Sequence, residues 1–249
     1  MRVSVSAAML VLSAGAFGCG GADPPVAVPA VTAEAAAPPD ASAASAKPEG
    51  PSGALPTACD DTKDGACLPE AAFVKRLCAT FHPEVALAMF AKGTPWTRGY
   101  LRGAVDAWNA SGGLSSADKL AFDEEVIVVR RRSAGHGPIH VSGAGGGYDV
   151  LRWDGSCASL TDGELTLKAP PTKPKAAKIP WRNLEASMKS ALSSDEKIGK
   201  AVADRRKECT GEASGDVTPK CAKADEVVSG VIVDYVRAGG AVPAPTRMP

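Results

Sequence analysis

Seven cysteines are the side chains with the widest choice of chemistry in this 249-residue chain. A deprotonated cysteine is a nucleophile and a metal ligand, and two cysteines can also pair as a disulfide. The seven occupy positions Cys19, Cys59, Cys67, Cys78, Cys157, Cys209 and Cys221. Cys19 directly follows an apolar N-terminal run, whereas the others lie farther along the chain. The sequence thus sets one thiol apart from six that can pair with one another.

These six cysteines allow fifteen sets of three disulfides, and the sequence alone does not choose among them. Local spacing favours Cys209–Cys221, because these two residues flank a polar loop between two expected helices. Closing a loop of this size stabilises a fold by about 3 kcal/mol in the chain-entropy model. For the remaining four cysteines we favour the pairings Cys59–Cys67 and Cys78–Cys157. The first pairing brackets a polar turn, and the second joins an expected helix to an expected strand.

The N-terminal run begins after Arg2 and covers residues 3–17, which is too short to span a bilayer comfortably. It ends in Ala16-Phe17-Gly18-Cys19. This segment resembles the lipobox of bacterial lipoproteins, although the commonest lipobox has Leu in place of Ala16 and a small residue in place of Phe17. The resemblance implies that residues 1–18 are a signal peptide and that Cys19 is acylated. It also implies a protein held at a membrane in the cell envelope.

Two other interpretations of this N-terminus stay open. Ordinary secretion, with cleavage after Ala14-Gly15-Ala16, also satisfies the rule for small residues at the cleavage site. Alternatively, Cys19 is an unmodified cysteine of the apolar run. The following segment, 19–58, favours the lipoprotein interpretation, because it is rich in Ala and Pro and has no aromatic residue. We expect this segment to be a disordered tether that holds a folded domain away from the membrane.

No pattern of residues predicts a metal site or a catalytic centre. His82 follows Cys78 by four residues, and His136 and His140 are also four apart, but Gly and Pro exclude a helix at the latter pair. There is no Cys-x2-Cys pair and no Gly-x-Ser-x-Gly motif. The acidic run 123–125 is expected to be a solvated loop, and the glycine-rich segment 142–147 a turn. We therefore expect a protein that is not an enzyme and has no cofactor.

One expected strand carries a possible binding surface. Two aromatic and two basic side chains alternate there with small or apolar residues: Trp96, Arg98, Tyr100 and Arg102. On a strand, residues two apart share one face. This face is expected either to form a structural cation–π ladder or to bind glycan, peptide or an anionic polymer, with the basic residues 130–132 nearby.

The elements that would position these residues belong to the α+β class. Helices are expected at 70–81 and 85–90 in a cysteine-containing segment, 59–95. The segment 96–169 reads as an antiparallel β unit with strands at 125–132, 139–141, 148–153, 156–160 and 164–168. Asp154-Gly155 and Asp162-Gly163 join the last three strands as a meander. The unit resembles an SH3-like barrel in its size and in the spacing of its short strands, and a small open sheet is the alternative.

The C-terminal part is expected to be helical. A linker, 170–180, precedes helices at 181–192, 195–209 and 219–237, which together make a disulfide-stapled hairpin within 181–240. The tail 241–249 is expected to be loose. Charges balance at 28 basic and 28 acidic residues, which argues against a nucleic-acid binder.

From these features we expect a non-catalytic binding or scaffold module that is tethered to a membrane. Its expected partner is cell-wall polymer or an envelope protein. An alternative is a structural or interaction protein that acts through its C-terminal helices. An enzyme with an unrecognised motif is the less favoured possibility.

Overall fold

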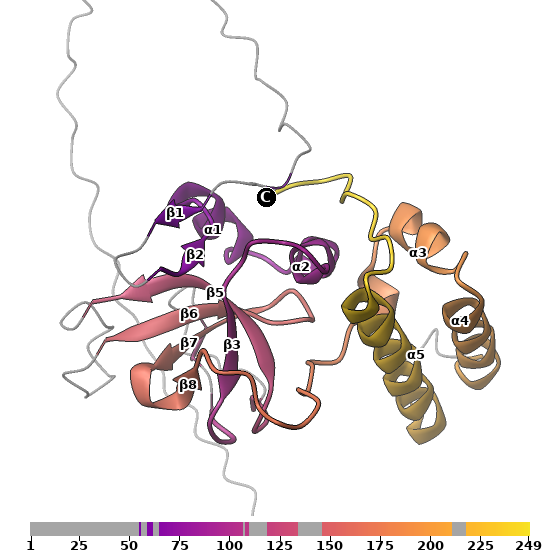
Figure 1. The fold of residues 1–249 in the computed structure, drawn as a ribbon. Coiled ribbons are helices and arrows are strands. Elements are labelled where there is room, and N and C mark those ends of the chain that lie inside the picture. The colour runs from indigo at the N-terminus through magenta and orange to yellow at the C-terminus, as the bar shows by residue number, and fades with distance from the viewer. Residues whose placement is uncertain are drawn as a thin grey trace, which may run out of the picture. The chain divides into compact units, whose positions relative to one another are not determined.

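The β-branched run of residues 125–132 forms strand β5 of an antiparallel sheet flanked by helices (Figure 1). The computed structural model describes residues 55, 59–61, 65–106, 108–109, 119–133, 146–210 and 218–249. These residues all lie in one unit, Pro48–Pro249. Cys19, the expected signal peptide, almost all of the expected tether and the expected strand at 139–141 lie outside the described residues. The α+β class predicted from the sequence is confirmed.

Six strands form the sheet in the order β4-β7-β6-β5-β3-β8. Their bounds are β3 Arg98–Leu101, β4 Trp108–Asn109, β5 Glu125–Arg132, β6 Gly147–Leu151, β7 Cys157–Thr161 and β8 Leu165–Thr166. Strands β4 and β8 stand at opposite edges, so the described strands make an open sheet. The SH3-like barrel was therefore the wrong expectation, and its open-sheet alternative is confirmed.

Strands β6 and β7 form the first hairpin of the predicted meander, and β5 pairs with the other side of β6. The Asp154-Gly155 turn joins β6 to β7, and Gly155 has φ +85° where its Cα approaches the backbone of His82 and Pro83. The next strand was placed wrongly, because β8 pairs with β3 and not with β7. A 3-10 turn, Asp162–Glu164, stands where a two-residue hairpin was expected, and it directs the chain to the other edge.

Two short helices precede the main sheet, α1 Ala71–Leu77 and α2 Pro83–Phe90. The first ends four residues earlier than predicted, and Phe81, at the end of the predicted helix, is 43% exposed. Proline disfavours helical geometry in the residue before it, and His82 accordingly has φ −129° and ψ 72°. Pro83 itself occupies the first turn of α2, where its missing N–H costs no hydrogen bond.

The C-terminal helices are α3 Ala186–Leu192, α4 Glu196–Glu208 and α5 Pro219–Ala238. The helix expected at 181–192 is broken, since Trp181–Asn183 is a 3-10 turn and Leu184 is extended. Asp195 caps α4, and Thr218 caps α5 by accepting the amide proton of Cys221. No helix in the described part of the chain is long and apolar enough to cross a bilayer.

The three disulfides have the pairings favoured from the sequence: Cys59–Cys67, Cys78–Cys157 and Cys209–Cys221. The first lies beside a two-stranded sheet of β1 (Asp60–Asp61) and β2 (Cys67–Leu68). The second joins the end of α1 to β7, across 79 residues of sequence. The third joins α4 to α5 across a separation of 12 residues.

Both faces of the sheet are covered by apolar side chains, as the alternation along β5 illustrates. Ile127 and Val129 belong to the larger core, which includes side chains of α1, α2 and the C-terminal helices. Val126 and Val128 belong to a smaller core on the opposite face. One strand thus contributes to both layers, as expected where neither face meets water.

The segments expected to be a linker and a loose tail are packed against the rest of the structure. In the linker Ile179 is buried, and its amide donates to the hydroxyl of Ser229 at 2.8 Å. In the tail Thr246 donates its amide proton to the carboxylate of Glu185 at 3.1 Å. Leu55, from the expected tether, is partly buried against the larger core. Composition did not predict these contacts, because they form between residues far apart in the sequence.

Candidate functional site

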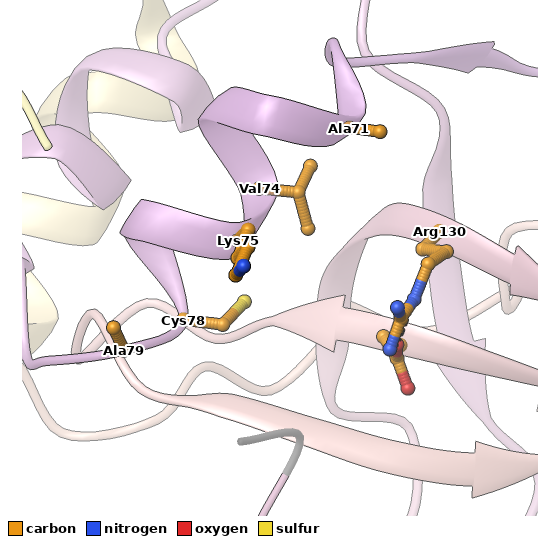
Figure 2. A pocket seen from close by; sticks show the side chains of 7 residues that line it. Ala71, Val74, Lys75, Cys78, Ala79 and Arg130 are labelled. Carbon is orange, nitrogen blue, oxygen red and sulfur yellow. Dashed lines mark hydrogen bonds and ion pairs between the residues drawn. The ribbon is translucent and has the colours of Figure 1, made fainter.

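A cavity of about 500 Å³ lies between α1 and the neighbouring strands β5 and β6 (Figure 2). The apolar residues that line it come from α1 and the turn after it: Ala71, Val74, Cys78 and Ala79. The charged residues that line it are Lys75, Arg130 and Asp149. This volume is in the range of small-molecule sites.

Helix α1 presents one side of the cavity through its spacing. Ala71, Val74, Lys75 and Cys78 lie three or four residues apart, so they project from one part of the helix surface. In Figure 2 these side chains and that of Arg130 stand on opposite sides of the cavity. Cys78 is fixed there by its disulfide to β7.

A β-bulge places Arg130 on this side of the sheet. Val128 pairs with Val150, but the next pair is Arg130 with Asp149, which leaves Val129 as an extra residue in β5. Side chains alternate between faces along a strand, so an uninterrupted register would carry Arg130 to the other face. The bulge therefore brings this guanidinium beside the Asp149 carboxylate.

The Asp149 carboxylate is only 1% exposed and meets donors at both oxygens. Its Oδ2 accepts from Nε of Arg130 at 2.5 Å and also contacts Nη2 of that side chain. Its Oδ1 accepts from the Ser159 hydroxyl at 2.7 Å. Nε of Arg132 lies 3.2 Å from Oδ1 as an ion pair, while Nη2 of Arg132 donates to the carbonyl of Leu160. The negative charge and both oxygens of the buried Asp149 carboxylate are thus satisfied by protein groups, and no ligand is needed for this.

The charges around the cavity sum to a positive value. Arg130, Arg132 and Lys75 contribute three positive charges, and Asp149 contributes one negative charge. Lys75 is exposed and forms no ion pair with any residue that the structure describes. Within the described lining, Cys78 is held in a disulfide and Asp149 is occupied, so neither offers a free nucleophile or base. The arrangement is suited to binding an anion.

The strand face predicted as a possible binding surface lies against the helices. Trp96 and Tyr100 are only 4% and 9% exposed, and only Arg102, beyond the end of β3, is well exposed. Burial, followed by the charge of Glu125, raises the pKa of Tyr100 above its ordinary value. The four residues do not form an open strip, and the cation–π contact of Arg98 is made with Phe90 of α2. The sequence predicted which residues share a face but not what covers that face.

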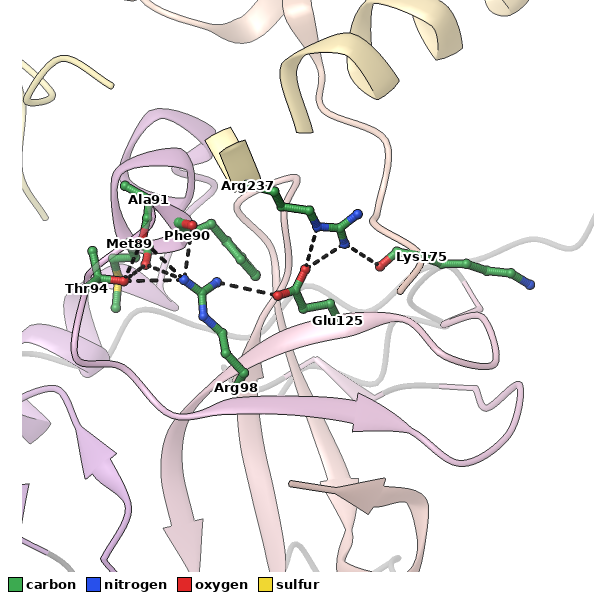
Figure 3. Close-up of polar contacts among 8 residues, drawn as sticks. All are labelled: Met89, Phe90, Ala91, Thr94, Arg98, Glu125, Lys175 and Arg237. Atoms are coloured by element: carbon green, nitrogen blue, oxygen red, sulfur yellow. Dashed lines mark hydrogen bonds and ion pairs between the residues drawn. The ribbon is translucent and has the colours of Figure 1, made fainter. Parts of the chain in front are cut away.

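Arg98 joins this face to α2 (Figure 3). Its Nη2 donates to the carbonyl of Phe90 at 3.0 Å, and its guanidinium lies 4.8 Å from the centroid of the Phe90 ring. The Phe90 ring stacks on Trp153 with centroids 4.0 Å apart. On this side of the sheet, aromatic and cationic groups thus form a packed structural ladder.

Glu125 joins the same ladder to α5. It accepts from Arg237 Nη2 at 2.6 Å and Nε at 3.0 Å, and Arg98 Nη1 lies 3.9 Å from its Oε1 (Figure 3). Burial lowers the pKa of Arg98, and the charge of Glu125 opposes that shift. Neighbouring Glu124 is also buried and accepts from Nε of Arg152 at 2.7 Å. The solvated acidic loop expected at 123–125 was therefore wrong for two of its three residues.

The groups considered for metal binding are engaged elsewhere. Of the described residues, Cys209, Cys221 and Asp225 bring ligand atoms together, but both sulfurs belong to one disulfide. His82 contacts the hydroxyl of Thr80 at 2.6 Å, and the nearby Cys78 is also disulfide-bonded. His136 and His140 lie outside the described residues.

Two further cavities adjoin α5. One, of about 560 Å³, lies between the start of α4 and α5, and its acidic residue Asp195 is already the cap of α4. The other, of about 220 Å³, lies beside the linker and is crossed by the exposed ion pairs Lys173–Asp234 and Lys178–Glu226. The cavity beside α1 differs because a buried carboxylate holds one of its cations in place.

Sequence reasoning missed two of the three charged residues that line this cavity, Lys75 and Asp149. The helical spacing of residues 71, 74, 75 and 78 was a usable signal for the α1 side. No feature of the sequence predicts the bulge that brings Arg130 beside Asp149.

No protein-family model, no curated protein and no solved structure matches this chain.

Proposed function

We propose that this protein is an exported lipoprotein, anchored through Cys19, that binds an anionic group of an envelope component without transforming it. The binding site is the cavity beside α1. The observation that carries this proposal is the position of Arg130, held by the buried Asp149 at the wall of a cavity with excess positive charge. Three disulfides support a location outside the reducing cytoplasm.

The geometry favours binding over catalysis. A guanidinium fixed by a buried carboxylate is already oriented for an incoming carboxylate or phosphate, so less conformational entropy is lost when the ligand binds. Lys75 adds a second cation from the opposite wall. Cell-wall polymer is the first envelope component to test, because many such polymers are anionic.

The anion site is tested by titrating the protein with acetate and with inorganic phosphate, followed by NMR chemical shifts. Arg130→Gln and Lys75→Gln should each weaken binding about tenfold, whereas Arg102→Gln, an exposed arginine outside the cavity, should leave it unchanged. Arg132 and Ser159 still compensate Asp149 in the Arg130→Gln protein, so the fold is retained. Equal binding by all four proteins would refute the site.

Co-sedimentation with purified wall polymer uses the same variants to test the envelope partner. The anchor is tested separately by labelling with a radioactive fatty acid in cells. The wild type should incorporate label and Cys19→Ala should not. Label in the variant, or none in the wild type, would refute the anchor.

A second candidate function is protein contact through the C-terminal helices. It is favoured by Val227, an apolar residue of α5 that is 52% exposed. Removing these helices would not be a clean test, because Ile232 and Val236 of the same helix are buried in the larger core. Val227→Glu is the better variant, and it should abolish co-purification of an envelope protein if this surface is the contact.

A further inference from the structure

The wall of the cavity that α1 provides is apolar as well as close to the cations. Val74 is buried in the protein, and Ala71 and Ala79 add methyl groups at the rim. The sulfur of Cys78 belongs to a disulfide, so this wall has no ionisable thiol. Water beside such a wall is displaced favourably by an aliphatic group.

The opposite wall provides a fixed point for an acidic head. Nε and Nη2 of Arg130 are directed to Asp149, and Nη1 makes no hydrogen bond to another described residue. Lys75 stands on the α1 side as an exposed, flexible cation. An acid group between them would meet two positive charges while its attached carbons lie along α1.

From this juxtaposition we infer that the ligand is an aliphatic carboxylate: an acid head at Arg130 and Lys75 and a short alkyl body on Val74 and Cys78. This inference rests on the proposed function, because it concerns the same cavity. It adds the ligand class, since simple anion binding requires no apolar body. A volume of about 500 Å³ limits the body to a small molecule or to the end of a longer chain.

The inference is tested with a chain-length series. Acetate, butyrate and hexanoate are titrated into the full-length protein, with hexylammonium as the matched cation. Each methylene placed on the apolar wall should strengthen binding about fourfold, the equivalent of ~0.8 kcal/mol. Butyrate should therefore bind more than tenfold better than acetate, and hexanoate better again. Hexylammonium should not bind, because its head would meet Arg130 and Lys75.

Two variants separate the head from the body of the ligand. Arg130→Gln should weaken acetate and hexanoate by a similar factor. Ala71→Asn, at an exposed position of the apolar wall, should reduce the gain from acetate to hexanoate and leave acetate binding unchanged. Arg102→Gln again serves as the control that should change neither.

The outcomes distinguish this inference from the proposed function. Equal affinity for acetate and hexanoate, both lost in Arg130→Gln, would overturn the aliphatic ligand and leave the anion site standing. Hexylammonium binding as tightly as hexanoate would also overturn it. Failure of every anion to bind would overturn both. Displacement of hexanoate from Cys19→Ala protein by phosphatidylcholine vesicles that carry oleate would identify a membrane fatty acid as the source, and its retention would identify a soluble carboxylate.

Discussion

Glu125→Gln is expected to destabilise the protein strongly, because it removes the one carboxylate between two partly buried guanidinium groups. Gln keeps the shape of the side chain, but Arg98 and Arg237 then face each other across the sheet–α5 contact without a counter-charge. Removing one partner of a buried ion pair costs about 3–5 kcal/mol. Both arginines retain some contact with water, so the lower value, about 3 kcal/mol, applies.

This loss should appear in calorimetry as a fall in Tm of about 6–12 °C for a domain of this size. The double variant Glu125→Gln/Arg237→Met should recover part of it, because one of the two unpaired charges is gone. The control is Asp234→Asn, which removes an exposed partner of Lys173 and should cost less than about 1 kcal/mol. If Glu125→Gln costs no more than Asp234→Asn, the reasoning about this buried network is refuted.

Three other outcomes are expected. Replacing Cys209 and Cys221 by Ser should lower the free energy of unfolding by about 3 kcal/mol in urea titrations, and an unchanged midpoint would contradict the chain-entropy argument. Burial raises the pKa of Glu185, but hydrogen bonds from Thr246 and Ser187 together lower it. The stability that the ionised Glu185 contributes is therefore fully present above the unfolded pKa of about 4.3 and is lost as the pH falls through the folded pKa. Hydrogen exchange of the Thr246 amide, which donates to this carboxylate, should accordingly accelerate only in acid. Because its pKa is raised, Tyr100 should ionise above the ordinary range of a tyrosine in an ultraviolet titration, and Tyr100→Phe should remove that late step.

The sequence predicted those parts of the fold that depend on neighbours along the chain. The β-branched run 125–132 forms β5 with the expected bounds, and the helices expected at 195–209 and 219–237 are α4 and α5, each within one residue of its expected ends. Cys209 and Cys221 were favoured because only a short loop separates them. Local spacing and local capping are visible in a sequence because few residues decide them.

The parts that failed depend on distant contacts. Glu125 looked like a solvated acid before a strand, yet its hydrogen-bond partner Arg237 lies 112 residues away. Trp96 and Tyr100 were correctly placed on one face, but only the helices that pack there decide that the face is buried. The candidate site likewise depends on a register shift opposite Asp149, which has no signature in the order of residues.

The bulge at Val129 also changes what a one-residue deletion would do to this protein. Deletion inside a strand normally turns every following side chain to the wrong face. Here, removing Val129 would join Val128 directly to Arg130 and leave the pairing of Arg130 with Asp149 in place. The loss would be one buried side chain of the larger core. The strand therefore has a position where its length can vary while the orientation of the charged groups is kept.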